Sequence, residues 1–196
     1  MSDNPSKLLL SHLDLLTAID YSLPVLDLAC GTGRNGLVLS MQGMDVVFAD
    51  KSVSALRVVE QRLLKAGVSG RVWQVNLELP GVNPFSGDRY AAVLGFCYLH
   101  RPLFPLLKKA VMSGGLVVYE TFTTVQRKFG HPNNPDFLLR PGELKATFEE
   151  WQLIHHFEGI RPNPDRGIAQ IVARRPEICK DQPVRTGRPV KAEGAR

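Results

Sequence analysis

The chain of 196 residues has little of several features that would define its class. Its three cysteines, Cys30, Cys97 and Cys179, form no C-x-x-C pair and no metal-ligand spacing, so we expect neither a disulfide framework nor a metal site. An odd, sparse cysteine count is typical of a reducing compartment. The N-terminus lacks the features of a signal peptide, and no apolar run approaches the roughly 18 residues of a membrane helix. These absences predict a soluble, cytoplasmic protein without a membrane partner.

Positive charge is in modest excess and is concentrated near the C-terminus. The formal net charge is +5, and residues 180–196 contain five Lys/Arg and two Asp/Glu, a net charge of +3. Because this stretch is rich in Pro, Gly and charge and poor in large apolar residues, it cannot bury enough surface to order itself. We therefore expect one domain over residues 1–175 and a basic, flexible tail over 176–196. A solvated tail is the simpler interpretation; an RNA- or phosphate-binding arm is the alternative.

Short apolar runs alternate with helical patterns along most of the chain. Strands are expected at residues 24–29, 44–50, 71–76, 89–96 and 116–122, with helices at 35–42, 52–66 and 101–112. A short helix is expected at 141–147, followed by strands at 151–160 and 167–175 joined by a hairpin-like connection. Strands that alternate with helices predict an α/β fold with a doubly wound, mostly parallel sheet, and the two last strands predict an antiparallel end.

Two stretches carry more specific expectations. Ser52 is the expected N-cap of the helix over 52–66 and Gly67 its terminator. The spacing predicts that this helix buries one face, consisting of Leu56, Val59, Leu63 and Leu64. Residues 123–141, with three prolines and one glycine between Thr123 and Pro141, read as a long excursion that is either a lid or an ordinary surface loop.

The segment VLDLACGTGRNG at residues 25–36 carries the clearest functional signal. Gly31, Gly33 and Gly36 fit the G-x-G-x-x-G of dinucleotide enzymes, and Asp50 follows Gly31 by 19 residues, where an acid would accept ribose hydroxyls. The same features suit an S-adenosylmethionine loop, because both cofactors require the backbone to turn sharply and approach the ligand. The glycines alone do not decide between the two cofactors.

Asp27 favours the second interpretation. It lies within an otherwise apolar strand, where burying an unpaired carboxylate is costly. A dinucleotide fold has little use for a carboxylate there, whereas S-adenosylmethionine carries an ammonium group that a carboxylate can bind.

The segment resembles motif I of class I S-adenosylmethionine-dependent methyltransferases, acid-x-Gly-x-Gly-x-Gly, with Ala29 in place of the first glycine. VVFADKSVSAL, QVNLELP and SGGLVVYE resemble the later motifs in the family's order, so the likeness covers residues 23–122. It implies a Rossmann-like, seven-stranded fold. It also implies cofactor contacts from the first two acids, the glycine loop, the third motif and the fourth strand: Asp27, Ala29, Cys30, Gly31, Thr32, Gly33, Arg34, Asn35, Asp50, Lys51, Asn76, Leu77 and Phe96.

Two further segments, residues 98–122 and 134–144, resemble small bacterial methyltransferases of the tellurite-resistance type. The class I resemblance implies in-line methyl transfer from S-adenosylmethionine. The compact chain, with no added domain, favours a small-molecule acceptor over a macromolecule. A dedicated base is needed only if the acceptor must lose a proton. The sequence indicates neither the acceptor nor an oligomeric state.

Residues after the fourth strand are the candidate acceptor-site groups. Tyr98 would lie near the sulfonium, His100 would be a base, and Arg101 would orient an anionic acceptor. Each has a plainer alternative: Tyr98 and Phe96 as core residues, and Arg101 as a solvent-facing residue that begins a helix.

The remaining polar residues divide between structural and functional interpretations. Glu120, at the end of the fifth strand, would pair with an arginine, for which Arg140 is the candidate, or line the acceptor pocket. His155 and His156 are adjacent in a strand and are interpreted as structural, because neighbours in a strand point to opposite faces and cannot jointly bind a metal in the usual way.

Three other functions compete with small-molecule methylation. An RNA or protein methyltransferase would use the basic tail, but GFCY stands after the fourth strand where an amine-methylating enzyme would have an N-P-P-Y-type tetrapeptide. A NAD(P)-dependent oxidoreductase would use the glycines and Asp50 and would leave Asp27 unexplained. A non-enzymatic cofactor-binding protein is the third, because no essential catalytic residue can be named.

Overall fold

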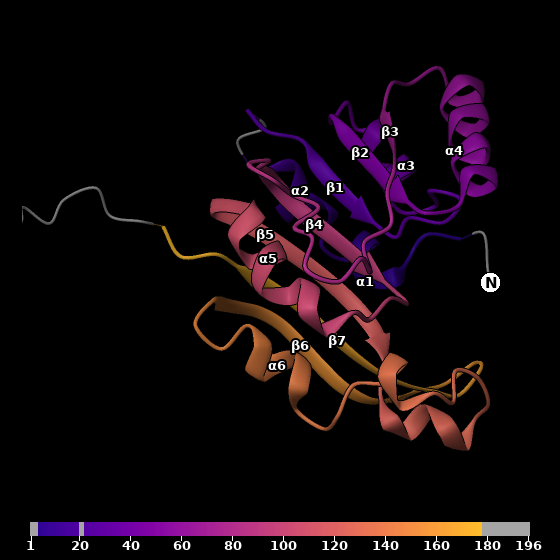
Figure 1. Cartoon of the computed structure of the whole chain (residues 1–196), viewed down its shortest axis with the longest axis vertical. Coiled ribbons are helices and arrows are strands. Elements are labelled where there is room, and N and C mark those ends of the chain that lie inside the picture. Colours follow the sequence, from indigo (N-terminus) through magenta and orange to yellow (C-terminus); the bar gives the residue numbers. More distant parts are fainter. Residues whose placement is uncertain (1–3, 20–21, 178–196) are drawn as a thin grey trace, which may run out of the picture.

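A computed structural model describes residues 4–19 and 22–177. Seven strands form one sheet in the order β3-β2-β1-β4-β5-β7-β6 (Figure 1). The first five strands run parallel to one another, and β7 is antiparallel to both β5 and β6. The strands are β1 (Val25–Leu28), β2 (Val46–Asp50), β3 (Arg71–Gln74), β4 (Tyr90–Phe96), β5 (Val111–Phe122), β6 (Gln152–Arg161) and β7 (Arg166–Arg174). The predicted mostly parallel α/β sheet with an antiparallel end is confirmed.

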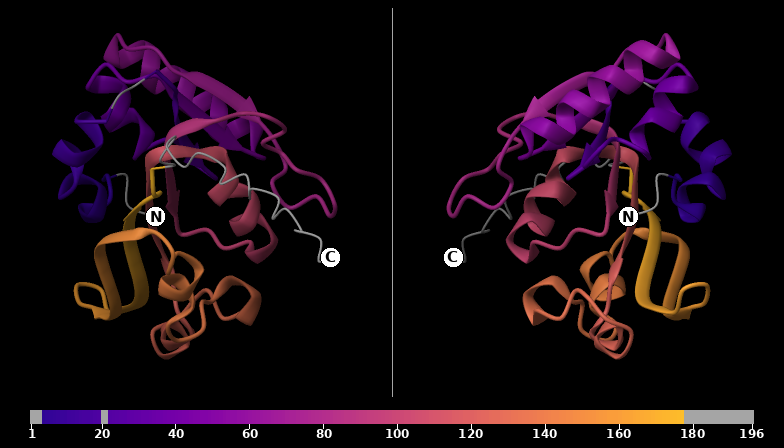
Figure 2. Two further views of the ribbon diagram at one scale, coloured as in Figure 1. Left: turned by 90° about the vertical axis from the view of Figure 1, so that its left-hand side faces the viewer. Right: turned by 90° about the vertical axis from the view of Figure 1, so that its right-hand side faces the viewer.

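Helices connect the strands and cover both faces of the sheet (Figure 2). The α-helices are α1 (Lys7–Leu10), α2 (Leu13–Thr17), α3 (Gly36–Met41), α4 (Val53–Ala66), α5 (Phe104–Ala110) and α6 (Glu143–Thr147). Three 3₁₀ turns complete the described chain: η1 (Arg101–Leu103), η2 (Thr124–Lys128) and η3 (Pro135–Phe137). Helices α1 and α2 were not predicted, since each has only four or five residues. No helix among the described residues is long and apolar enough to cross a bilayer.

Two apolar clusters lie on opposite faces of the sheet. Side chains of α5 and α6, such as Leu107 and Leu144, pack on one face, and side chains of α1 to α4, such as Leu9 and Val59, pack on the other. Every residue of β1 and β4 is buried. Central strands covered on both faces explain their near-continuous apolar sequences, and they make Asp27 conspicuous as the charged residue of β1.

Helix α4 follows its predicted boundaries. The Ser52 hydroxyl accepts a hydrogen bond from the Ala55 amide at 3.2 Å, and Gly67 ends the helix with φ of +67°. Leu63 is buried, as predicted, but Leu64 is 84% exposed, so that expectation was wrong. Residues 63 and 64 are 100° apart around a helix, and the sheet contacts the stripe that contains Leu63.

Strand β5 begins earlier than its sequence indicated. Tyr90 pairs with Val111 and Ala92 pairs with Leu116, so residues 112–115 bulge out of the ladder. Gly114 has φ of +76° within this bulge. Gly114 is therefore part of an irregularity inside the strand.

The two neighbouring leucines of α4 provide a test of this packing. We expect Leu63→Ala to lower the free energy of unfolding by about 2–4 kcal/mol, because it leaves a cavity in the core. Leu64→Ala, the matched surface control, should change it by less than about 0.5 kcal/mol. Urea unfolding followed by circular dichroism measures both values, and equal losses would contradict the placement of the helix.

Candidate functional site

The loop between β1 and α3 leaves the sheet through unusual backbone conformations. Ala29, Gly31 and Gly33 have φ of +50°, +56° and +75°. Glycine adopts these values readily, whereas alanine does so at a cost. A Cβ at Gly33 would lie 2.8 Å from Cγ2 of Val59 in α4. The loop is therefore packed tightly against α4 at Gly33. At Gly31, by contrast, an added Cβ would meet no atom within 4 Å.

Asp27 is buried under this loop and ties it to the sheet. Its Oδ2 accepts a hydrogen bond from the Gly36 amide at 2.8 Å, and its side chain is 1% exposed. Burial raises the pKa of Asp27 to about 7, against the lowering effects of the Gly36 amide and the Arg34 charge; the Asp50 charge raises it further. The bond to Gly36 gives the carboxylate a structural use with either cofactor, so the presence of Asp27 alone does not separate the two interpretations.

Asp50 links the end of β2 to the same loop. Its Oδ2 accepts from the Gly31 amide and its Oδ1 from the Ser52 amide, each at 2.8 Å. An ionised carboxylate offers about four acceptor positions, so two remain for ribose hydroxyls. The side chain is only partly buried, which keeps these positions accessible from the carboxyl ends of the strands. Asp50 therefore fits the ribose role that was predicted.

Arg34 and Asn35, both predicted to contact the cofactor, hold the N-terminal segment against the loop. Arg34 Nη1 donates to the Asn4 carbonyl at 2.5 Å, and Asn35 Oδ1 accepts from the Ser6 amide at 2.8 Å. Asn35 is buried and Arg34 partly buried. Sequence reasoning missed this contact, because its partners lie about 30 residues apart.

The other residues of the loop are held locally. The Cys30 thiol donates to the Gly31 carbonyl at 3.4 Å, and burial is the main reason that its pKa is raised. The Thr32 carbonyl accepts from Arg62 Nη1 of α4 at 3.2 Å. A thiol with a raised pKa is a poor nucleophile at neutral pH, which agrees with reading Cys30 as a loop residue.

Predicted adenine contacts gather at the ends of β2 and β3. The Asn76 side chain accepts from the Glu78 amide at 3.0 Å, and Lys51 lies 3.4 Å from the Glu78 carboxylate. Leu77 is buried and lines a cavity of about 520 Å³ together with His100. Lining side chains come from the β3–β4 connection and from the chain after β4: Leu77, Glu78, Leu79, Pro80, Gly81, Val82, Asn83, His100, Pro102, Leu103, Pro105 and Leu106.

The aromatic residues after β4 occupy different surroundings. Phe96 is 8% exposed and belongs to the apolar cluster that α1 to α4 cover, so the core alternative describes it. Tyr98 is partly buried and packs against the opposite cluster. Its carbonyl accepts a hydrogen bond from the Tyr119 hydroxyl at 2.9 Å.

Polar groups also line the carboxyl ends of β4 and β5. Glu120 is buried and accepts from Gln170 Nε2 of β7. The predicted pairing of Glu120 with Arg140 was wrong: the exposed Arg140 contributes its backbone amide to Glu143, 2.7 Å from Oε2. Cys97 has φ of +56°, and burial followed by the charge of Glu120 raises the pKa of its thiol.

Arg101 connects the chain after β4 to the excursion. Its Nε and Nη2 donate to Glu143 Oε1 and Oε2 at 2.6 and 2.9 Å, in a two-pronged ion pair. It also donates to the Asp136 and Leu138 carbonyls at 3.1 and 2.8 Å. The hydrogen bond with Arg101 is the main cause that lowers the pKa of Glu143. Arg101 thus uses four hydrogen bonds to hold residues 136–143, so the solvent-facing alternative was wrong. Its role in orienting an acceptor stays a prediction.

The adjacent histidines face different partners. The His155 ring lies 5.2 Å from the His12 ring, and its Nε2 is 3.3 Å from Gln170 Oε1. His156 Nε2 is buried without a hydrogen-bond partner among the described residues. Residues 4–19 and 22–177 contain no group of three or more His, Cys, Asp or Glu side chains that could hold a metal.

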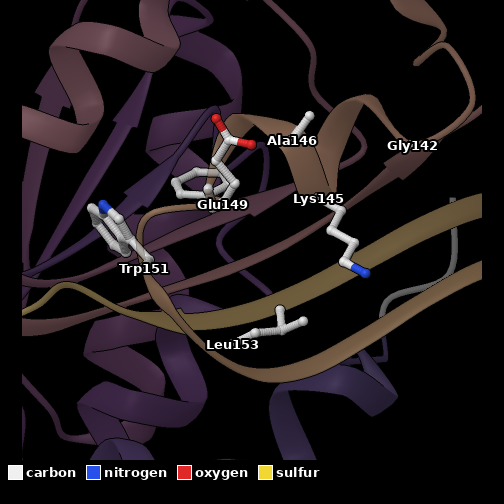
Figure 3. Close-up of a pocket in the computed structure, with 7 residues that line it drawn as sticks. Gly142, Lys145, Ala146, Glu149, Trp151 and Leu153 are labelled. Atoms are coloured by element: carbon white, nitrogen blue, oxygen red, sulfur yellow. The ribbon is translucent and has the colours of Figure 1, made fainter.

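A second cavity, of about 330 Å³, lies between α6 and β6 (Figure 3). Figure 3 shows Lys145 and Leu153 on its two sides. Leu153 pairs with Ala173 near the end of β7, which lies beside the start of β5 and so at the opposite end of the sheet from the glycine loop. None of the predicted site residues lines this cavity.

The Arg101–Glu143 pair can be tested as a structural clamp. We expect Glu143→Gln to lower the free energy of unfolding by about 1–3 kcal/mol, because the arginine loses a partly buried ionic partner. Arg101→Glu alone should lower the free energy of unfolding further, because it places two carboxylates side by side. Combining Arg101→Glu with Glu143→Arg should restore part of the lost free energy. Thermal unfolding of the wild type, these three variants and Glu143→Arg alone measures this. A double variant whose loss equals the sum of the Arg101→Glu and Glu143→Arg losses would contradict the clamp.

The family model described as "Tellurite resistance protein TehB" matches residues 6–162. A curated relative, the "Probable S-adenosyl-L-methionine-dependent methyltransferase TehB" of Haemophilus influenzae, is 25% identical over 158 residues. The match covers 76% of this chain and 54% of the relative, so the chain spans about half the length of that relative.

Solved structures show the same fold. The crystal structure of TehB from Haemophilus influenzae has a TM-score of 0.68 at 21% identity and covers 84% of this chain and 61% of its own. A structure described as "Conversion of a Disulfide Bond into a Thioacetal Group during Echinomycin Biosynthesis" has a TM-score of 0.67 at 16% identity and covers 90% and 84%. The sheet order and the family match over most of the chain lead to one assignment: this chain belongs to the TehB tellurite resistance protein family.

Proposed function

We propose that the chain binds S-adenosylmethionine over its glycine loop and transfers the methyl group to a small-molecule acceptor. The main support for cofactor binding is a pair of acids, Asp27 in β1 and Asp50 at the end of β2. Both accept hydrogen bonds from backbone amides of the segment that would hold the cofactor. Asp50 has free acceptor positions for ribose hydroxyls, and the negative charge of Asp27 suits the ammonium group of the methionine half. The family membership and the name of the curated relative support the same cofactor.

The acceptor would lie over the carboxyl ends of β4 and β5, beside the cofactor. Fixed segments border this region on two sides. The N-terminal segment is tied to Asn35, and the start of the excursion is tied to β7, because Gln126 Oε1 accepts from the Gly167 amide at 3.0 Å. A site bordered in this way suits a small acceptor better than a macromolecule. The second solved structure concerns echinomycin biosynthesis, which is consistent with small-molecule chemistry on this fold.

Methyl transfer from a sulfonium is a displacement in line with the breaking bond. Proximity and alignment alone account for several kcal/mol of the barrier, so the chain's main contribution is to hold both reactants and exclude water. His100 lines the 520 Å³ cavity together with Leu77, which supports a position near the adenine side of the proposed site. Its role as a base stays a prediction that applies only to an acceptor with a proton to lose.

The competing functions make different predictions. Binding to RNA would involve the basic tail, of which residues 178–196 lie outside the described chain, and would weaken steeply with salt. A nicotinamide cofactor would place an anionic pyrophosphate over the loop that covers Asp27. Titration calorimetry with S-adenosylmethionine, S-adenosylhomocysteine and NADH separates these possibilities. We expect micromolar binding of the two sulfur compounds, no binding of NADH, and release of S-adenosylhomocysteine once an acceptor is supplied.

The pKa of Asp27, about 7, predicts how cofactor affinity depends on pH. Because the ammonium group binds the ionised carboxylate, the dissociation constant of S-adenosylhomocysteine should rise up to about tenfold for each pH unit below 7 and level off above 8. Calorimetry between pH 5.5 and 8.5 measures this. Asp27→Asn keeps an acceptor for Gly36 but has no charge, so its affinity should be weaker above pH 7 and nearly independent of pH. A wild-type affinity that does not change with pH would exclude Asp27 as the ammonium partner.

Ionisation of Asp27 should favour cofactor binding but destabilise the folded chain, so folding stability and cofactor affinity should change in opposite directions with pH. A raised pKa in the folded state means that its contribution to stability is fully present below the unfolded value of 3.8 and is lost as the pH rises through about 7. The ligand-free protein should therefore gain stability at pH 8 on Asp27→Asn, while its cofactor affinity falls. Thermal unfolding with and without S-adenosylhomocysteine measures both changes.

A further inference from the structure

Strand β6 forms an edge of the sheet with no strand on its outer side. Among the described residues it pairs with β7 alone, at the other end of the strand order from β3 (Figure 1). Proteins commonly shield such an edge with lysine, proline or a very short strand, because a free edge readily pairs with another chain. β6 has ten residues, and none of them is lysine or proline. Its outer side is therefore open to a further strand.

Two large apolar side chains of this strand are exposed. Leu153 is 43% exposed and Ile160 is 51% exposed. Their partners in β7 are Ala173 and Gly167, which are six residues apart, so both side chains extend from the same face of the sheet. It is the face that α5 and α6 cover, because Ala173 belongs to that apolar cluster. Exposed apolar residues on a free edge strand are typical of a surface that pairs with another chain.

A bulge makes the strand complementary to itself. Ile154 is the extra residue where the register of the β6–β7 ladder shifts. Counted along β7, Leu153 and Ile160 each lie three positions from Phe157, on either side of it. In an antiparallel pair of two identical β6 strands centred on Phe157, Leu153 of one copy therefore lies directly opposite Ile160 of the other. Both exposed apolar residues are covered at once, on the same face.

The charged positions also agree with this register. Gln152 of one copy would lie opposite Arg161 of the other, and His156 would lie opposite Glu158, the one acid of β6. Like charges placed directly opposite each other destabilise a pair of strands. A pair centred on Glu158 would bring two carboxylates together, whereas the pair centred on Phe157 brings none. Charge therefore favours the same register as the apolar side chains.

A cavity lies beside the exposed leucine. Leu153 lines the cavity of about 330 Å³ between α6 and β6, together with the apolar side chains of Phe148 and Trp151. Figure 3 shows Leu153 on the β6 side of this cavity, across from Lys145 of α6. Because Cβ atoms directly opposite each other in a sheet are about 4.5–5.5 Å apart, Ile160 of a second copy would lie next to the cavity. Its apolar lining suits that side chain.

We propose that β6 is a dimerisation surface, on which two copies of this chain pair their β6 strands antiparallel about Phe157 and join their sheets into one. The interface is symmetric, since each copy presents the same strand to the other. A second copy is the occupant because the apolar and charged positions of β6 complement each other in this register. The interface lies beyond β7, away from the glycine loop, so the inference does not depend on the proposed cofactor.

Sedimentation equilibrium of the full chain tests whether the dimer forms. Between about 1 and 200 μM, the mass should rise with concentration from the 21.7 kDa of one chain toward twice that value. Ile160→Lys should raise the dissociation constant of the dimer at least about tenfold, because each dimer loses two apolar pairs and gains two edge lysines. Leu64→Lys is the matched control: this exposed leucine lies on α4, which packs on β2 and β3, so the variant should associate like the wild type.

The substituted positions are exposed, so both lysine variants should keep the thermal midpoint of the wild type. A chain that stays a monomer at every concentration would overturn the proposal and leave residues 178–196 or another protein as the occupant of the edge. Association that Ile160→Lys does not weaken would place the dimer interface on another surface and would overturn it equally.

Cross-linking tests the register. A Leu153→Cys chain mixed with an Ile160→Cys chain should form an inter-chain disulfide on mild oxidation, because directly opposite residues lie within the Cα separation of about 4.4–6.8 Å that a disulfide needs. Either variant alone should give no more cross-linked dimer than oxidised wild type, because two identical positions would be six residues apart along the strands, about 20 Å. A mixture that does not cross-link, or a single variant that does, would show that the proposed pairing is wrong.

Discussion

A carboxylate inside the first strand determines the geometry of the site. Asp27 can accept the Gly36 amide only if α3 begins directly above β1, and that closeness leaves no room for a side chain at residue 36. A Cβ there would lie 2.5 Å from the Phe48 ring and 2.8 Å from the Asp27 carboxylate. The backbone must therefore turn from β1 into α3 within a few residues. It does so through left-handed conformations at Ala29, Gly31 and Gly33. The loop's shape follows from this buried hydrogen bond.

Around this fixed centre, side chains from distant parts of the sequence hold the borders of the site. Asn35 binds the N-terminal segment, Arg101 binds the end of the excursion, and Gln126 binds the start of β7. Each of these three side chains comes from outside the strands. The proposed cofactor half is thus built on hydrogen-bonded strands, and the proposed acceptor half is bordered by loops held through single side chains. Such a division lets the acceptor side vary among relatives while the cofactor side keeps its shape.

Sequence patterns predicted the parts of the structure that local chemistry determines. The central strands are continuous apolar runs, Ser52 and Gly67 mark the ends of α4, and the glycine loop with Asp50 identifies the carboxyl edge of the sheet. What could not be predicted depends on contacts between distant residues. Arg101 and Glu143 are 42 positions apart, and Glu120 and Gln170 are 50 apart, so neither pairing leaves a local signal. Leu64 shows the same limit within a helix, since spacing indicates a stripe but not its width.

The two acids of the site differ in burial, and that difference bears on the choice of cofactor. Asp50 is partly exposed, so it can exchange water for neutral hydroxyl groups at little cost. Asp27 is fully buried and its pKa is close to neutral, so a nearby cation would favour its ionised form and a nearby anion would oppose it. S-adenosylmethionine brings two positive groups to this region, an ammonium and a sulfonium, whereas a dinucleotide would bring a pyrophosphate. Burial therefore makes Asp27 a selective element: the hydrogen bond to Gly36 would serve either cofactor, but its charge favours only the cationic one.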